Sequence, residues 1–338
     1  MTTPVEIYPS TLQDDAFESH LGMPINQHNA HLQDETVMRV GIPHKGGHLT
    51  MHAFNEGYPV MVSASAFWHA PSNSFKIPEA TNLMELDLAL DSAGFTAVKL
   101  WQSKGKQRGM AGIYPWDYSD YIELASSMGV NWWSQPDLCC EPEVAGNQAE
   151  IDYRINATAT LLEGTLRTVW AWQNELAKTV SARTVANMIK PPVPVIQGRS
   201  ASDYLRSLDL LMRVWERWMP WLALPSLIGV GSVCRRSLNH PTQGLYAILA
   251  ALEGRLPTGS RLHMFGVKGS CLSKLKMMPW VASADSMAFD VGARMKALKS
   301  GHSNSMAHRS VEMTEWMQVN GRRLKPAAGD QLRLGFQA

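Results

Sequence analysis

The sequence predicts an α/β protein, most simply a (β/α)8 barrel of the TIM type. Short, continuously apolar segments alternate along the chain with longer segments whose apolar residues recur every three or four positions. Apolar strands that alternate with helices are typical of a parallel sheet covered on both faces. Seven such units fill about 240 residues, which fits a barrel better than an open doubly wound sheet.

The strand candidates follow one another at fairly regular intervals. They are residues 58–65, 88–92, 130–137, 193–198, 227–232, 261–267 and 281–286. The clearest helix candidates between them are residues 117–129, 147–178, 200–218 and 241–254. No internal repeat and no long Gly/Ser or Pro linker divides this part of the sequence. The pattern does not locate an eighth strand.

Two polar segments flank the predicted barrel, which we place at residues 57–300. Residues 1–56 are rich in His and Gly and weakly patterned, so we expect an N-terminal arm or irregular layer there. Residues 301–338 are polar and basic, and they contain one helix-like run at 305–319. We therefore expect a helical C-terminal extension.

Composition narrows the functional classes. The 338 residues are 45% hydrophobic and 18% charged, as in ordinary globular proteins, and 31 basic residues face 30 acidic ones. A nucleic-acid partner would therefore need a local basic patch. The four cysteines form no CxxC pair, which argues against a zinc ribbon or a disulfide framework. No secretory signal or uninterrupted apolar span is evident, so we expect a cytoplasmic protein.

Polar side chains stand where several predicted strands end. A (β/α)8 barrel carries its chemistry on the loops that follow these ends, so the side chains should share one rim. Any one of them could instead cap the next helix, but the third and fourth strands precede no obvious helix start. The strand-end residues are Asp91, Asp137, Gln197 with Gly198, Gly229 with Val230, and Asp285.

Basic residues follow the same strands. Cations gathered on the rim of a nearly neutral chain suit an anionic ligand, most simply a phosphate backbone, although solvated loops commonly carry Lys and Arg. The residues are Lys104, Lys106, Arg108, Arg199, Arg235, Arg236, Lys268 and Arg294.

Six motifs between about residues 58 and 300 resemble, in order, those of the tRNA-guanine transglycosylase superfamily. "DSAGF" (91–95) resembles D-S-G-G-[FY], "VIQGR" (195–199) resembles V-Q-G, and "IGVGSV" (228–233) resembles I-G-G-x-x-V. "RLHMFGVKG" (261–269) resembles R-x-L-[MF]-G-[VA]-G, and "QPDLCCEP" (135–142) resembles the segment of the base-reading Asp. "ADSMAFDVGAR" (284–294) resembles the segment around the nucleophilic Asp. No single motif is specific, but the ordered set is.

The departures from this family point to one branch of it. The tRNA-acting enzymes carry a Cys-x-Cys-x-x-Cys…His zinc site after the nucleophile strand, whereas only Cys271 lies beyond residue 234 here. No appended RNA-binding domain follows either. The chain is most similar to the zinc-free 7-deazaguanine DNA transglycosylases of bacterial modification islands and phages. The resemblance implies DNA and a free base such as preQ0 as partners, with no metal or organic cofactor, in a bacterial cell or a phage-infected host.

The resemblance also implies a role for each candidate. Asp285 would be the nucleophile that attacks C1′ and forms a glycosyl-enzyme with net retention, as in retaining glycosidases. Asp290 competes, because the bacterial family reads F-D-C-V and this chain has "FD" at 289–290. Asp285 is favoured because it ends an apolar strand and because Arg294 reproduces the D-x8-R spacing. Asp91 would be the general acid/base.

The remaining roles concern the base and the strand that carries it. Phe95 and Phe265 would sandwich the purine, while Asp137, Gln197 and Gly198 would bind its edge. Backbone groups of Gly229 and Val230 would read its carbonyl, although the family has Gly-Gly at this place. A base inside a duplex must be flipped out or met on an unpaired strand, which an accessory DNA-remodelling protein could provide. The eight cations would hold the backbone.

Three other functions remain open from the sequence. A tRNA-guanine transglycosylase that lacks zinc would use the same chemistry on another polymer. A metal-dependent barrel hydrolase is disfavoured, because no H-x-H or H-x-x-x-H ligand pair is present. A non-catalytic nucleic-acid-binding accessory subunit is disfavoured by the presence of both Asp91 and Asp285.

Overall fold

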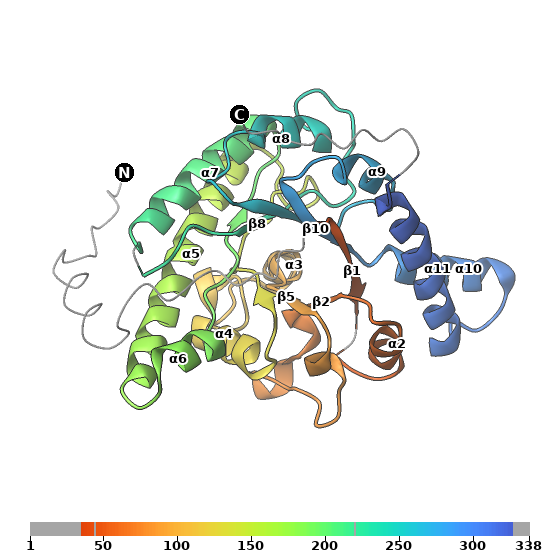
Figure 1. The fold of residues 1–338 in the computed structure, drawn as a ribbon, viewed down its shortest axis with the longest axis horizontal. Coiled ribbons are helices and arrows are strands. Elements are labelled where there is room, and N and C mark those ends of the chain that lie inside the picture. Colours follow the sequence, from red (N-terminus) through yellow and green to blue (C-terminus); the bar gives the residue numbers. More distant parts are fainter. Residues whose placement is uncertain (1–34, 44, 220, 327–338) are drawn as a thin grey trace.

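The computed structural model describes residues 35–43, 45–219 and 221–326. Its main feature is an eight-stranded parallel sheet, curled and surrounded by helices, with strand order β6-β5-β2-β1-β10-β9-β8-β7 (Figure 1). The α/β class and the parallel sheet are confirmed. The strands are β1 (Val37–Ile42), β2 (Val60–Ser63), β5 (Leu88–Asp91), β6 (Trp132–Trp133), β7 (Val195–Ile196), β8 (Leu227–Val230), β9 (Arg261–Met264) and β10 (Val281–Ser286).

Each of the seven predicted strand segments contains one of these strands, and β1 supplies the eighth. It lies in the segment assigned to the N-terminal arm, yet it pairs with β2 and β10 in the middle of the sheet. Arg39 interrupts its apolar pattern. This side chain is buried, donates to Asp87 Oδ1 at 2.9 Å and lies over the Trp132 ring. The ordered sheet therefore begins well before residue 57.

The two edges of the sheet approach each other after β6 and before β7. An isolated parallel bridge joins Ser134 to Val193. The Gln135 N–H donates to the Val193 carbonyl at 2.9 Å, and the Val193 N–H donates to the Trp133 carbonyl at 2.7 Å. The curled sheet with this bridge is compatible with the predicted TIM-type barrel.

Apolar side chains fill both sides of the sheet. An inner cluster of Met61, Ala89, Trp132, Val193, Leu227 and Ala282 occupies the space inside the curl. A larger cluster lies between the outer face and the helices. The described helices are α2 (His48–Glu56), α3 (Gly94–Lys104), α4 (Tyr118–Ser127), α5 (Gln148–Ala177), α6 (Ala182–Met188), α7 (Ala201–Glu216), α8 (Leu245–Leu252), α9 (Leu272–Leu275), α10 (Ala288–Ser300) and α11 (Met306–Leu324).

Local signals explain several helix boundaries. Asp117 and Ser200 form capping boxes with Asp120 and Asp203, so α4 and α7 begin where these side chains satisfy the first N–H groups. A small antiparallel pair, β3 (Trp68–His69) with β4 (Ser74–Phe75), follows β2. None of the helices in the described ranges is long and apolar enough to cross a membrane.

The last described helix packs against the first described strand and helix. Helix α11 covers the helix-like run expected at 305–319 and packs against α10, α2 and β1 (Figure 1). Its Arg309 forms an ion pair with the buried Asp290 of α10. This part of the C-terminal segment is therefore packed against the sheet and its helices.

Candidate active site

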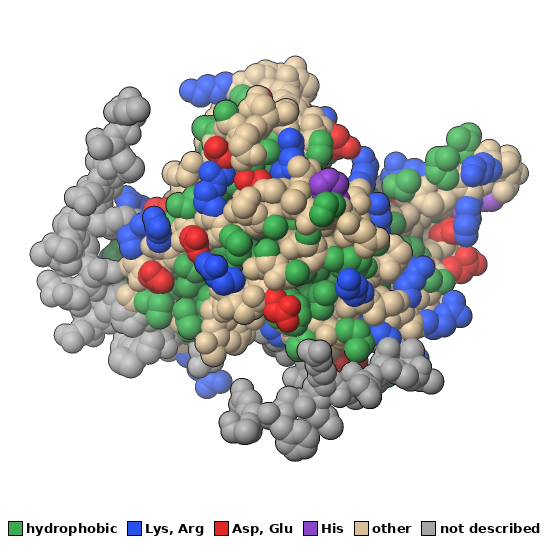
Figure 2. All heavy atoms as spheres, turned by 90° about the horizontal axis from the view of Figure 1, so that it is seen from above, with side chains coloured by type: hydrophobic (Ala, Val, Ile, Leu, Met, Phe, Trp, Pro, Cys, Tyr) green, Lys and Arg blue, Asp and Glu red, His purple; other side chains and the backbone are tan. Residues whose placement is uncertain are grey.

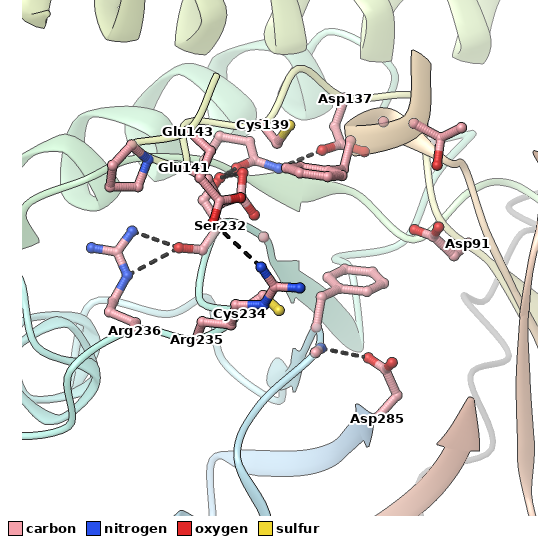
Figure 3. Close-up of a pocket in the computed structure, with 18 of the residues that line it drawn as sticks. Asp91, Asp137, Cys139, Glu141, Glu143, Ser232, Cys234, Arg235, Arg236 and Asp285 are labelled. Carbon is pink, nitrogen blue, oxygen red and sulfur yellow. Dashed lines mark hydrogen bonds and ion pairs between the residues drawn. The ribbon is translucent and has the colours of Figure 1, made fainter. Parts of the chain in front are cut away.

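A cavity of about 600 Å³ opens at the carboxyl ends of the parallel strands. Six of the predicted site residues line it together with three of the predicted cations (Figure 3). They come from the ends of six strands and from the segments that follow. The set comprises Asp91, Phe95, Asp137, Gln197, Phe265 and Asp285, with Arg199, Arg235 and Arg236.

Asp285 lies near the end of β10, and one of its carboxylate oxygens is held in place. The Gly266 N–H donates to Oδ1 at 2.9 Å, and His263 Nε2 lies 3.3 Å from the same atom. Because the contacts made by the described residues fall on Oδ1, Oδ2 is left available to a ligand. The residue lines the cavity and is 9% exposed, so its carboxylate is largely shielded from bulk water.

His263 supports the nucleophile candidate from inside the sheet, and the sequence motifs did not identify it. Its side chain is completely buried, and its Nδ1 lies 2.8 Å from Ser283 Oγ. The rings of Trp132 and Phe265 pack edge-on against the imidazole, with distances of 4.8 and 4.6 Å between ring centroids. Burial lowers the pKa of His263, which keeps the ring neutral at neutral pH. A polar residue inside the apolar strand "RLHMFGV" was the available signal.

Asp91 ends β5 immediately before α3. Its Oδ2 accepts from the Ala93 N–H at 3.0 Å, and Ala93 adopts the left-handed conformation with φ 68°. Burial, together with the negative charge of Asp285, raises the pKa of Asp91 to about 6. This carboxyl group can therefore both carry and release a proton near neutral pH.

Asp137 follows β6 and is almost completely buried. Ser92 Oγ donates to its Oδ1 at 2.7 Å, and the Gln197 amide donates to its Oδ2. Burial and the charge of Asp91 raise the pKa of Asp137 to about 7. A Cβ at Gly94 would lie 2.7 Å from the Asp137 carbonyl and 2.8 Å from Oδ1, so only glycine admits this carboxylate.

Two further polar residues, which the motifs did not identify, continue this network. Ser232 Oγ lies 2.5 Å from Gln197 Oε1 and 3.0 Å from Glu141 Oε2. The Gln197 side chain lies so close to Gly231 that a Cβ there would be 2.1 Å from its amide nitrogen. Glu141 stands four residues after Asp137 in "QPDLCCEP", and Ser232 follows Gly231 in "IGVGSV". These two positions were the available sequence signals.

The three backbone positions expected to bind the base lie just outside the cavity lining. Gly229 and Val230 are within β8, where the Gly229 N–H donates to the Pro194 carbonyl and the Val230 carbonyl accepts from Phe265. The Gly198 carbonyl accepts from Arg236. Gly231, two residues after Gly229, lines the cavity instead.

The two predicted aromatic walls both line the cavity. Phe95 lies in the first turn of α3 and is 40% exposed. Phe265 is partly buried and packs over Gly229, where a Cβ would lie 2.5 Å from its ring. Both aromatic side chains are therefore placed where they can contact a flat ligand.

The predicted cations fall into two groups. Arg236 donates to the Ser232 and Gly198 carbonyls and so fixes the rim loops, whereas Arg235 is 78% exposed at the side chain and lies 3.4 Å from Glu143. Figure 2 shows Lys and Arg spread over one face of the molecule among apolar and acidic side chains. The cations that do not line the cavity are Lys104, Lys106, Arg108, Lys268 and Arg294.

Asp290, the alternative nucleophile, has a different environment. It is 1% exposed inside α10, and both of its oxygens are paired. Arg309 Nε donates to Oδ1 at 2.7 Å, and the Arg294 guanidinium lies 2.5 Å from Oδ2. Asp290 does not line the cavity. Among the described residues, no group of three or more His, Cys, Asp or Glu side chains could hold a metal ion.

One known family matches this sequence over most of its length. The family is DpdA, described as DeoxyPurine in DNA protein A, and its model matches residues 52–330. The match includes every strand from β2 to β10, helix α11 and all of the candidate site residues. No curated protein matches the sequence.

Proposed function

Because the chain belongs to the DpdA family, which implies guanine transglycosylase activity on DNA, we propose that it exchanges guanine for a 7-deazaguanine base such as preQ0. The observation that supports this most directly is the pair Asp91 and Asp285. Both carboxyl groups line one cavity, but one carries a raised pKa and the other is held by a backbone N–H. One proton carrier and one nucleophile are the two groups that base exchange requires.

In the first half-reaction, Asp285 Oδ2 attacks C1′ of the target deoxyguanosine. The C1′–O bond forms as the C1′–N9 bond breaks, and the electron pair of the broken bond stays with the base. Asp91 donates its proton to a ring nitrogen of the departing guanine. The Gly266 N–H and His263 hold Oδ1 while Oδ2 reacts. The product is a covalent glycosyl-enzyme with inverted C1′.

The second half-reaction reverses these steps with another base. Asp91, now ionised, accepts the N9 proton of the incoming 7-deazaguanine, and N9 attacks C1′. The C1′–O bond breaks, and Asp285 returns to its carboxylate form. Two inversions give net retention, and the phosphodiester backbone is never cut.

The remaining cavity residues would select and hold the nucleotide. The carboxylate of Asp137 and the amide of Gln197 offer hydrogen-bonding groups to the purine edge, while Phe95 and Phe265 contact its faces. Gly231 is the backbone position that lines the cavity next to Gln197. Arg199 and Arg235 would contact phosphates. Base flipping by this chain, or strand opening by an accessory DNA-remodelling protein, supplies the unstacked guanine.

The direct test is incubation of the purified protein with DNA, tRNA and labelled guanine or preQ0, followed by digestion to nucleosides. We expect label in DNA deoxynucleosides. Label in tRNA alone would favour the tRNA-acting alternative, and label in neither polymer would refute a transglycosylase. The Asp285→Ala variant is the control, because it removes the attacking oxygen without touching the Asp137 side of the cavity.

A further inference from the structure

Four polar side chains form a continuous line from the buried Asp137 to Glu141 at the cavity wall (Figure 3). Asp137 Oδ2 contacts the amide nitrogen of Gln197, whose oxygen lies 2.5 Å from Ser232 Oγ. Ser232 Oγ lies 3.0 Å from Glu141 Oε2. The two inner members, Gln197 and Ser232, therefore each have a hydrogen-bonding neighbour on both sides within this line.

The Ser232 hydroxyl group cannot satisfy all of its neighbours in this line with its single hydrogen. A hydroxyl group donates one hydrogen bond, and its oxygen accepts up to two. The Cys140 N–H already donates to Ser232 Oγ at 2.5 Å. The remaining neighbours, Gln197 Oε1 and an ionised Glu141, are both acceptors, so one of them would face Ser232 without a hydrogen. Because Ser232 is buried, a contact between two acceptors at its hydroxyl group is unfavourable.

One added proton removes the conflict in either of two arrangements. In the first, Glu141 is protonated and donates to Ser232, Ser232 donates to Gln197 Oε1, and the Gln197 amide donates to an ionised Asp137. In the second, the amide is rotated by 180°, which exchanges its oxygen and nitrogen without moving the other heavy atoms. Asp137 is then protonated and donates to Gln197, Gln197 donates to Ser232, and Ser232 donates to an ionised Glu141.

We propose that Asp137 and Glu141 share a single proton through Gln197 and Ser232, which makes Glu141 a positioning residue that sets the charge of the base-reading carboxylate. This inference rests on the proposed function. The edge of guanine presents N–H donors, which require Asp137 to be ionised. Binding of the base therefore moves the proton to Glu141 instead of releasing it to solvent.

The groups around this pair leave one competitor for the proton. Burial raises the pKa of the neighbouring thiols and phenols, and the arginines remain cationic. Asp91 is thus the nearby group that also titrates close to neutral pH. The charged or titratable side chains that face the pair are Asp91, Tyr114, Tyr121, Cys139, Cys140, Arg154, Tyr204, Cys234, Arg235 and Arg236.

Calorimetry of guanine binding tests the proposal, with the Asp91→Asn substitution in every protein so that Asp91 contributes no protons. Binding heats measured in buffers with different ionisation enthalpies give the number of protons exchanged. Otherwise unsubstituted protein should exchange almost none below pH 7. Ser232→Ala interrupts the line, and Glu141→Gln removes the carboxylate that would take up the proton. In each of these variants, base binding should release up to about one proton to solvent per base bound. Ser92→Ala is the matched control, because Ser92 contacts Asp137 outside the line.

An infrared measurement gives a second readout that does not depend on the Ser232 variant. With ¹³C-labelled glutamate, guanine binding should produce the band of a protonated Glu carboxyl group, and Glu141→Gln should abolish it. Guanine binding with the same proton count in all variants, or without the Glu band, would overturn this inference alone. Absence of guanine binding would overturn the proposed function as well.

Discussion

Two aspartates five residues apart, Asp285 at the end of β10 and Asp290 in the first turn of α10, lie in opposite environments. Asp285 lines the cavity, accepts a hydrogen bond from one backbone N–H and lies 3.3 Å from the nitrogen of a neutral imidazole. Asp290 is enclosed between two arginines, one of which belongs to α11. A carboxylate fully matched by fixed cations stabilises packing, whereas one held through a single oxygen remains available for chemistry.

The structure also shows that the D-x8-R spacing does not reflect a contact between Asp285 and Arg294. That spacing relates Asp285 to Arg294, yet the Arg294 guanidinium contacts Asp290, one helical turn before it. The arginine therefore belongs to the packing cluster of α10 and α11 and not to the cavity. The position of Asp285 at the strand end is the feature that supports its assignment.

The sharpest test of this comparison substitutes each aspartate separately and compares the effects on base exchange and on stability. Asp285→Ala should lower base exchange by roughly 10⁴-fold or more, because the covalent step loses its nucleophile. Asp290→Asn should leave exchange per folded molecule nearly unchanged but lower the free energy of unfolding by about 3–5 kcal/mol, because the buried Arg309 guanidinium loses its ion pair with Asp290. Exchange assays and urea denaturation measure the two effects.

The double variant Asp290→Asn/Arg309→Met controls for the stability effect. Removing both charges should recover part of the lost free energy of unfolding, since the buried ion pair is then removed as a whole instead of being broken. If Asp290→Asn abolished exchange in a stably folded protein while Asp285→Ala remained active, the assignment of the nucleophile would be wrong.

The next largest effect concerns Asp91. As a general acid it must be protonated, and its pKa is raised to about 6, so the rate of guanine release should fall as pH rises through about 6. Asp91→Asn keeps an acceptor for the Ala93 N–H but carries no proton. We expect roughly 10²- to 10⁴-fold slower release and loss of this alkaline limb. A rapid-quench pH profile of the first half-reaction checks both; an unchanged limb in the variant would assign the proton to another group.

A smaller effect on the rate is expected from substitution of His263. Its imidazole lies beside Asp285, whereas Asp290 is contacted by arginines. His263→Phe retains a ring against Trp132 and Phe265 but removes the nitrogen near Asp285 Oδ1. We expect kcat to fall roughly 10- to 100-fold with little change in the KM for the free base, because orientation and not binding is lost. His263→Gln, which keeps an N–H donor, should recover part of kcat. Equal rates for His263→Phe and the unsubstituted protein would limit the imidazole to packing.

The sequence predicted those parts of the fold and site that follow from uninterrupted apolar strands. It identified seven strands and the polar residues at their ends, since the pattern marks both. It did not reveal β1, because Arg39 breaks the pattern and its partners, Asp87 and Trp132, are distant in the sequence. Glu141 and Ser232 lie within the segments "QPDLCCEP" and "IGVGSV", but these motifs give neither residue a role, and only folding places them beside Gln197. Contacts between separate loops cannot be read from local spacing.

The smallest predicted effect separates cations that can meet DNA from cations that are already neutralised. Arg235 lies at the cavity with a long, exposed contact to Glu143, whereas Arg294 is paired with the buried Asp290. Arg235→Ala should weaken DNA binding a few-fold and reduce the slope of log K against log salt by about 1, as for the loss of one phosphate contact. Arg294→Ala should leave that slope unchanged while lowering thermal stability. Equal slopes for the two variants would mean that the DNA backbone follows a path away from this side of the cavity.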